Sequence, residues 1–389
     1  MTSRTPAGFW TVWTSVAVDL LGFGIILPLL PLYAESFGAT PLTIGLLFAS
    51  YSLAQFLFSP VWGRVSDRVG RRPVLLATIA GSAVGSLVLG MAGSITMLFV
   101  GRIIDGVSGA SVAVARATVA DVAPAHERPR LMGLLGAAYG LGFVIGPSIG
   151  ALAALFGPAV PFFVAAGISL ANLVAAALRL PETRRAGVSA APSRAGAAGM
   201  PPAVIRFVLL TFVGVTAFGA FEATFALLGR SRFDLTDSMV ALVFSALGVV
   251  LVATQVGLVG PATRRLGEVG VIRLGLAGTA AGFLLIGLGS RWLTLAPGLA
   301  VVAAGQGLAM PAISSAVAGA APRERSGAAL GIQHSAGGLA RVVGPILGGA
   351  LFAIAAGLPY VAAAGLAVVG LVLVPAPAGT SRSATSRRG

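Results

Sequence analysis

Ionisable residues lie inside several long apolar stretches of this 389-residue chain. Asp19 stands near the middle of the first stretch, and Arg102 and Asp105 stand three positions apart in the fourth. Residues at this spacing share one helix face, so Arg102 and Asp105 can pair. A charge at the centre of a bilayer costs about 2.5 kcal/mol or more, and residues that carry it usually serve a function. We expect Asp19 or Asp105 to bind and release a proton, with Arg102 setting its affinity; the alternative is a permanent structural ion pair.

Further polar and aromatic residues occur in these and in other apolar stretches. Arg341 stands in mid-stretch, too deep to reach water easily, and should face a cavity or an acid. Glu222 stands near an outer end, where it either reaches water or lines a substrate path, and Arg116 stands near an inner end, where reaching water is favoured over binding an anion. Phenylalanines on the cavity side would suit a hydrophobic or aromatic substrate. The candidates for lining a substrate cavity are Phe23, Gln55, Arg116, Phe143, Glu222, Gln306, His334 and Arg341.

The composition excludes several classes of protein. Hydrophobic residues make up 57% of the chain and charged residues only 10%, so most of the chain cannot face water. The sequence has no Cys and two His, which excludes disulfide frameworks and thiolate zinc sites and argues against a metal enzyme. We expect no metal, no other cofactor and no enzymatic activity. No G-x-x-x-x-G-K-[ST] motif occurs, which argues against direct use of ATP.

Apolar runs of about 20 or more residues are long enough to cross a hydrocarbon core of about 30 Å as α-helix. Their apolar character is continuous rather than alternating, which favours helices over a β-barrel. The runs predict twelve spans at residues 9–33, 41–62, 73–93, 95–120, 131–153, 159–180, 203–229, 238–260, 270–290, 293–319, 327–355 and 358–377.

The basic residues predict the orientation of these spans. All 26 are Arg, and most fall in the loops on one side of the predicted membrane. The loops of the other side hold Arg230, Arg232 and Arg291. Because cytoplasmic loops collect basic residues, we expect a multi-pass protein of the plasma membrane with both termini in the cytoplasm. This distribution explains the net charge of +14 without a nucleic-acid partner.

A polar, small-residue segment at 181–202 separates two groups of six spans and is typical of a flexible linker. The two groups contain a repeat. Gly63, which opens GRVSDRVGRR, and Gly260, which opens GPATRRLGEV, differ by 197 positions, and Gly146 of GPSIG and Gly344 of GPILGG differ by 198. A shared offset indicates internal duplication. We therefore predict a first bundle at 1–180, a cytoplasmic linker at 181–202, and a second bundle at 203–389 with a short cytoplasmic tail.

The loop between the second and third spans is predicted to act as a cytoplasmic gate. Its glycines would let the backbone turn tightly and lie against a neighbouring helix. Its acid would accept from helix-terminal N–H groups and pair with a nearby arginine, holding the cytoplasmic side closed. The alternative is a plain positive-inside loop. The motif residues are Gly63, Asp67, Arg68, Gly70, Arg71 and Arg72.

The fifth span carries a stripe of small residues. Gly142, Gly146 and Gly150 recur every four positions, which permits close helix packing, and Pro147 removes a backbone hydrogen bond and bends the helix. We expect this stripe, and its copy at Gly344, Pro345, Gly348 and Gly349, to seal the two bundles against each other at a moving interface. The alternative is static packing.

The string at 63–72 resembles the loop motif of the major facilitator superfamily, G-x-x-x-D-R-x-G-R-R, at every motif position. GRIIDGVSGA is similar to the family's fourth-span motif, with Arg102 as its buried arginine, and residues 142–150 are similar to the fifth-span motif of its antiporters. The resemblance implies an all-α integral membrane protein with twelve transmembrane helices in two pseudo-symmetric six-helix bundles. Asp105 and Arg116 depart from the family's fourth span, and Arg264 stands where the repeat places Asp67, so gating by the loop motif should be asymmetric.

Within this family, the first span and the run 63–147 are similar to tetracycline-efflux and multidrug:proton antiporters. The resemblance implies export of a hydrophobic, drug-like small molecule, with a cation as one option, in exchange for protons, by rocking of one bundle against the other. The expected partners are the lipid bilayer, the substrate and protons, and the expected state is a monomer. Two alternatives stay open. One is a proton symporter or uniporter that imports a sugar, organic acid or other nutrient, and the other is a membrane receptor or scaffold that transports nothing.

Overall fold

The chain folds into helices joined mainly by short turns. A computed structural model describes residues 9–124, 127–180, 182, 199–322 and 325–375, and these contain helices and no strands. Most of the predicted linker at 181–202 lies outside the described residues. The helices are α1 (Phe9–Glu35), α2 (Pro41–Val69), α3 (Arg71–Gly90), α4 (Ile95–Ser108), α5 (Ser111–Val122), α6 (Arg128–Ala154), α7 (Val160–Arg179), α8 (Pro202–Phe233), α9 (Asp237–Gly257), α10 (Val259–Leu288), α11 (Trp292–Ala320), α12 (Ser326–Ile354) and α13 (Leu358–Leu373).

These helices correspond to the predicted spans. In the described part of the chain, eleven helical segments are long and apolar enough to cross a membrane, and α13 is a shorter apolar helix. The chain is therefore a multi-pass membrane protein, and the all-α membrane fold class is confirmed. The last span is shorter than predicted, because α13 ends at Leu373 and Pro375 follows. Proline disfavours helical geometry in the residue before it and donates no backbone hydrogen bond.

The predicted span at 95–120 is interrupted, because α4 ends at Ser108 and α5 begins at Ser111. An interruption inside a membrane frees backbone carbonyls that lipid cannot satisfy. Here two side chains of α2 satisfy them: Trp62 Nε1 donates to the Val107 carbonyl at 2.6 Å, and Gln55 Nε2 donates to the Gly109 carbonyl at 2.7 Å. The tertiary contacts therefore permit a break that the apolar run alone does not reveal.

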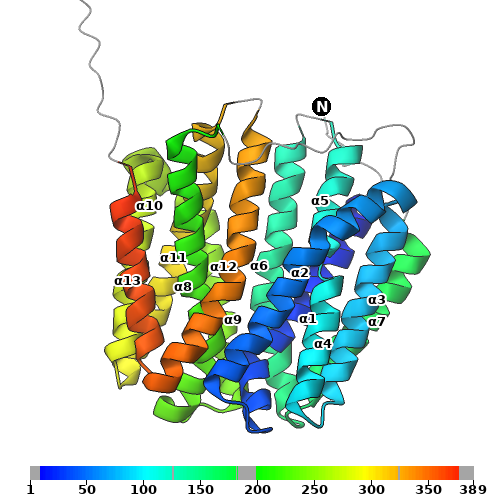
Figure 1. Ribbon diagram of the computed structural model, residues 1–389, viewed down its shortest axis with the longest axis horizontal. Coiled ribbons are helices and arrows are strands. Elements are labelled where there is room, and N and C mark those ends of the chain that lie inside the picture. Colours follow the sequence, from blue (N-terminus) through cyan, green and yellow to red (C-terminus); the bar gives the residue numbers. More distant parts are fainter. Residues whose placement is uncertain (1–8, 125–126, 181, 183–198, 323–324, 376–389) are drawn as a thin grey trace, which may run out of the picture.

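The helices form two groups, α1–α7 (the first group) and α8–α13 (the second group). Figure 1 shows α1–α5 and α7 together at the right, and α8 with α10–α13 at the left. Within the groups α1 packs on α6, α3 on α7, α8 on α12 and α10 on α11, while α2 with α12 and α6 with α9 form the main contacts between the groups. The α1–α2 connection lies at the lower edge of the view, and the last turn of α13 lies at the upper edge.

We call the end of the molecule that carries Gly70, Glu182 and the last turn of α13 the linker end, and the end that carries the α1–α2 connection the opposite end. At the opposite end the groups are in close contact. The Glu35 carboxylate on α1 accepts from the Arg230 guanidinium on α8 at 3.1 Å, and Arg230 also pairs with Asp237 on α9. A buried apolar cluster beneath these charges joins both groups and includes Leu30, Tyr33, Phe221, Phe225 and Phe244.

The repeat seen in the sequence appears in the backbone. α2 continues to Val69, and the chain turns at Gly70, whose φ is 108°. α10 contains one non-helical residue, Gly267, whose φ is 69°. These two glycines are 197 positions apart, and both adopt a conformation that residues with a side chain rarely adopt. The gate motif therefore forms a helix end with a single sharp turn rather than a loop across 63–72.

Gly63 does not have the role predicted for it. It lies inside α2, and a Cβ added there would meet no heavy atom within 4 Å. The expectation that Gly63 lets the backbone turn or approach a neighbouring helix is therefore wrong. Gly70 alone provides the turn of this motif.

The glycine stripe of α6 faces a different neighbour from the one predicted. A Cβ on Gly146 would lie 2.8 Å from the Gly24 Cα, and one on Gly142 would lie 2.7 Å from the Leu20 carbonyl, both on α1. The copy on α12 packs in the same way, since a Cβ on Gly344 would lie 2.6 Å from the Thr216 carbonyl of α8. The prediction that the stripes seal one bundle against the other is therefore wrong for the α6 stripe and for Gly344, which pack helices within each group. It holds for Pro345 and Gly349 of the copy, which contact α2 of the first group.

Other glycines bring the two groups together. A Cβ on Gly45 of α2 would overlap the Pro345 carbonyl of α12, and a Cβ on Gly349 of α12 would overlap the Pro41 carbonyl of α2. On the other side of the molecule, the Ser148 and Ser245 hydroxyls join α6 to α9 at 2.8 Å. The two groups thus meet through close backbone contact between α2 and α12 and through side-chain contact between α6 and α9. Pro345 takes part in the α2–α12 contact, and Gly344 does not.

These placements predict different effects for three alanine substitutions. Gly146→Ala should lower the Tm of the purified protein by an amount equivalent to about 1–3 kcal/mol, because the added methyl overpacks the α1–α6 contact. Gly349→Ala should leave Tm nearly unchanged but open the opposite end, because its methyl presses the groups apart. Gly63→Ala is the matched control and should change neither property.

The measurement uses the absence of cysteine from the natural chain. A single cysteine would be introduced by Ser52→Cys on α2, where residue 52 lines a cavity between the two groups. It would be labelled with a membrane-impermeant maleimide applied from each side. Gly349→Ala should increase labelling from the opposite end. Unchanged labelling together with a lowered Tm would show that Gly349 packs a static structure.

Candidate transport site

A central cavity between the two groups contains the charges predicted inside the spans. Helices α1 and α4 of the first group and α8 and α12 of the second all contribute to it. The cavity therefore gives charged side chains a setting away from lipid, as their cost in hydrocarbon requires. Among the residues predicted to have a role, it is lined by Asp19, Phe23, Gln55, Arg102, Asp105, Glu222 and Arg341.

Asp19 is held by a hydroxyl group rather than by a cation. The Ser111 hydroxyl donates to Asp19 Oδ2 at 2.5 Å, and the Ser82 side chain lines the same cavity. In the described part of the chain, Asp19 forms no ion pair within 4 Å. Serine hydroxyls can donate to a carboxylate and can also accept from a protonated carboxyl. This environment can accommodate both protonation states of Asp19.

Arg102 and Asp105 form the pair that their spacing predicts. Arg102 Nη1 lies 3.5 Å from Asp105 Oδ2, and both side chains are buried. The guanidinium also lies over the Tyr51 ring, 4.2 Å from its centroid, where the ring face attracts a cation. Asp105 is thus neutralised by a fixed partner, while Asp19 in the same cavity is not.

Glu222 and Arg341 are contributed by the second group. Glu222 was expected near the outer end of its span, but it lies in the interior of α8, which continues to Phe233, and it lines the central cavity. Of the two alternatives for Glu222, reaching bulk water from the membrane surface is therefore wrong, and a position on the cavity wall agrees with the other. Arg341 on α12 lines the same cavity as Glu222 without an ion pair between them within 4 Å, so the arginine faces a cavity, as its depth predicts.

Two further cavities open toward the linker end, and Arg116, His334 and Arg341 line both of them. Arg116 on α5 and His334 on α12 approach across the groups, with 2.8 Å between Arg116 Nη1 and His334 Nε2. Arg116 therefore faces a cavity between the groups rather than the membrane surface to which it was expected to extend.

Two of the predicted cavity residues line none of these three cavities. Gln306 is 5% exposed and is buried within α11 and its packing. Phe143 packs edge-on against Phe23, at 6.5 Å between ring centroids, and its backbone lies against Gly248 of α9. Both residues belong to helix packing, since a span's sequence does not say which of its faces meets a neighbour.

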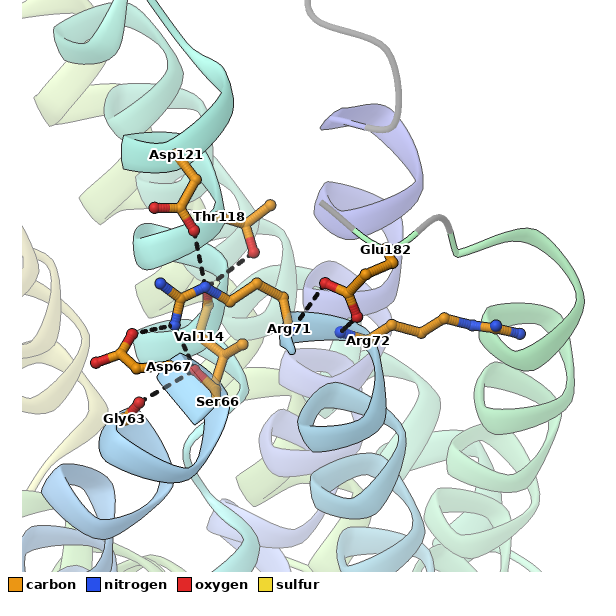
Figure 2. Close-up of polar contacts among 9 residues, drawn as sticks. All are labelled: Gly63, Ser66, Asp67, Arg71, Arg72, Val114, Thr118, Asp121 and Glu182. Carbon is orange, nitrogen blue, oxygen red and sulfur yellow. Dashed lines mark hydrogen bonds and ion pairs between the residues drawn. The ribbon is translucent and has the colours of Figure 1, made fainter. Parts of the chain in front are cut away.

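The gate motif forms a network around the Arg71 side chain at the linker end (Figure 2). Its guanidinium donates to Asp67 Oδ1 at 2.7 Å, to Asp121 Oδ2 at 2.8 Å and to the Ser66 hydroxyl at 2.5 Å. The Arg71 side chain is 9% exposed, whereas Asp67 is 58% exposed and Asp121 is 23% exposed. Asp121 is thus the more buried of the two anionic partners.

Glu182 has the capping role that was predicted for Asp67. Its two carboxylate oxygens accept from the backbone N–H groups of Arg71, at 3.0 Å, and Arg72, at 3.2 Å, at the start of α3 (Figure 2). A carboxylate is favourable at a helix N-terminus. A Cβ on Gly70 would overlap the Glu182 carboxylate, so glycine is required there both by φ and by this contact. The Arg72 guanidinium extends to the Ala177 carbonyl of α7 at 2.7 Å.

Sequence reasoning missed Asp121 and Glu182. Asp121 is the acid at the end of the fourth span, and Glu182 follows the sixth span directly. An acid at the end of a span is a candidate partner for the arginines of a neighbouring loop. Their pairing with a motif far away in the chain required the fold. All the network partners named here belong to the first group, so these bonds hold α2, α3, α5 and the end of α7 together and do not bridge the groups in this conformation.

The described residues contain no cluster of three or more side chains suited to hold a metal ion. The arrangement is that of a cavity between two helical groups, with acids and Arg102 at its centre and further arginines toward the linker end.

Comparisons with known proteins agree with this arrangement. The tetracycline resistance protein, class C, of Escherichia coli is 30% identical over 374 residues, which cover 91% of this chain and 93% of that protein. Multidrug resistance protein 2 of Bacillus subtilis (strain 168) is 29% identical and covers 94% of each chain. The crystal structure of the human organic anion transporter MFSD10 is 26% identical, has a TM-score of 0.71, and the match covers 95% of this chain and 99% of that one.

The crystal structure of the nucleoside transporter NupG shares the fold with a TM-score of 0.73 at 14% identity, over 94% of this chain and 98% of that one. A family match, described as Major Facilitator Superfamily, spans residues 12–258 and 207–389. Because these matches cover nearly the whole length of the chain, this protein belongs to the Major Facilitator Superfamily.

Proposed function

We propose that this protein exports a hydrophobic, drug-like small molecule in exchange for protons, by alternating access. The observation that carries the proposal is Asp19, an acid without an ion-pair partner among the described residues, in a cavity shared by the two groups. The names of the relatives, tetracycline and multidrug resistance proteins, support drug export. The aromatic lining of the cavity, with Phe23, Phe48 and Tyr51, suits an apolar compound.

We assign the proton to Asp19. Asp105 has a fixed cation at 3.5 Å, so protonating it would leave the buried Arg102 charge unpaired. Asp19 has a hydroxyl partner that tolerates either state. Gaining or losing a proton there changes the net charge of the cavity by one, which couples proton binding to what else the cavity can hold.

We further propose that the linker end faces the cytoplasm. The arginines of the predicted loops favour this side, and both termini would then be cytoplasmic. In this conformation the opposite end is closed by Glu35, Arg230 and the apolar cluster, while the cavities open toward the linker end. Residues 1–180 would rock against 203–389, with 181–202 as the connecting linker, in a monomer of the plasma membrane.

Inverted vesicles with an imposed inside-acid gradient test the function. The probes are rhodamine 6G and sulforhodamine B. These two dyes share a xanthene ring system and carry opposite net charges. Export corresponds to uptake into these vesicles, and uptake of at least one dye should depend on the gradient. Uptake that instead requires an inside-alkaline gradient, so that protons enter with the dye, would indicate a symporter, and gradient-independent equilibration would indicate a uniporter. No movement of either dye would favour a receptor or scaffold.

The Asp19→Asn substitution should abolish gradient-driven uptake and leave dye binding and Tm intact, because asparagine keeps the shape of the side chain but cannot exchange a proton. Asp105→Asn is the comparison. It removes the partner of a buried arginine and should destabilise the protein by about 3–5 kcal/mol, visible as a lower Tm. Normal gradient-driven uptake by Asp19→Asn would exclude Asp19 as the proton carrier.

The gate network predicts an order of effects for its two acids. Asp121→Asn should lower Tm and turnover more than Asp67→Asn does. The exposed Asp67–Arg71 pair contributes less than about 1 kcal/mol, whereas losing Asp121 removes the more buried partner of Arg71 and costs about 1–3 kcal/mol. Dye affinity should be unchanged in both variants, since neither acid lines a cavity described above. A larger loss for Asp67→Asn would assign the network's main role to the exposed acid.

A further inference from the structure

The two cavities at the linker end have a one-sided charge. Arg116, His334 and Arg341 line both, and no Asp or Glu is among the described residues that line either one. Their volumes are about 470 and 410 Å³, within the range of small-molecule sites. The acids Asp19 and Glu222 lie instead in the central cavity, which Arg341 also lines. A compound entering from the linker end therefore meets arginines before it meets carboxylates.

The charges of these arginines are not neutralised locally. Arg116 bonds to His334, an imidazole, at 2.8 Å, and a neutral imidazole supplies an acceptor but no negative charge. Arg341 forms no hydrogen bond or ion pair within the described residues, and Glu222 lines the deeper cavity rather than these two. A cavity lined by charge of one sign, between low-dielectric walls, concentrates ions of the opposite sign.

Apolar surface lies beside these cations. Phe56 and Tyr139 line one cavity, and Val215 and Met310 line the other. A ligand that fits this lining has an apolar ring body and an anionic group. Guanidinium forks bind carboxylate, sulfonate or phosphate oxygens with two parallel hydrogen bonds, which makes arginine more specific for such groups than a point charge.

We propose that Arg116, His334 and Arg341 form a subsite for the anionic group of the substrate, so that the exported compounds are amphipathic organic anions rather than cations. This inference rests on the proposed function and adds the substrate class. Arg116 belongs to the first group and Arg341 to the second. Closing the linker end brings the two guanidinium groups together, which is unfavourable until an anion lies between them, so a bound anion stabilises the closed form.

The transport test compares sulforhodamine B, an anion, with rhodamine 6G, a cation on the same ring system. Gradient-driven uptake by the natural protein should favour sulforhodamine B. Arg116→Gln and Arg341→Gln should each reduce its uptake about tenfold, the equivalent of one charge-assisted hydrogen bond, without reducing uptake of rhodamine 6G. Arg341→Lys should retain part of the activity. Arg206→Gln is the matched control, because Arg206 is exposed on α8 and lines none of the three cavities.

Equilibrium binding to purified protein in detergent, followed by dye anisotropy, gives a readout that does not depend on transport. Sulforhodamine B should bind about tenfold more weakly to Arg116→Gln and Arg341→Gln, and high salt should weaken its binding to the natural protein. Size-exclusion chromatography of each variant identifies the folded fraction that is assayed.

The outcomes separate the two proposals. Preferred uptake of rhodamine 6G, or an equal loss of both dyes in the arginine variants, would overturn the anion subsite and leave proton-driven export standing. Arginine-dependent binding of sulforhodamine B without gradient-driven uptake would support the subsite and overturn the export function. Unchanged anion binding in the folded Arg116→Gln and Arg341→Gln variants would also overturn the subsite.

Discussion

Hydrocarbon cannot hydrogen-bond, and this constraint governs the structure of this protein. Every backbone group in a span must find a partner inside the protein, so the chain crosses as helices. Where a helix breaks at Gly109, side chains from α2 occupy the freed carbonyls. Charged side chains obey the same constraint. Asp19, Arg102, Glu222 and Arg341 all face the cavity between the two groups, so the requirement to keep charge away from lipid places the candidate site inside the protein.

Close backbone contact has two separate roles. On α6 and α12 the glycine stripes press each helix against a partner in its own group, where a Cβ would collide with main-chain atoms. Such contacts make each group rigid. Gly45 and Gly349 bring α2 and α12 together across the groups, and this interface must change if the groups rock. The two kinds of contact use the same residue type, and the difference lies in which side of the helix the glycine occupies.

The duplicated halves share geometry more than chemistry. The sharp turn recurs at Gly70 and Gly267, and both glycine stripes pack in equivalent ways. The charges differ, because Arg71 with its two acids has no counterpart of the same sign. Glu268, 197 positions after Arg71, instead accepts from the Ser315 hydroxyl. The first group thus contains Asp19 and the charged network of the linker end, and the second group contributes Glu222, Arg341 and His334. The linker-end cavities are cationic because Arg116 of the first group and Arg341 of the second both line them.

The sequence by itself determined the helical membrane fold, most of the spans to within a few residues, the duplication and the family, because apolar length and motif spacing are local properties of the chain. It also identified Asp19 and the Arg102–Asp105 pair, because a charge in an apolar run is conspicuous wherever the run folds. Only the tertiary structure decided that Gly146 packs on α1, that Gln306 and Phe143 line no described cavity, and that Glu182 rather than Asp67 caps α3. A helix presents several faces, and its sequence does not state which neighbour meets each face. That choice depends on how all the helices pack together.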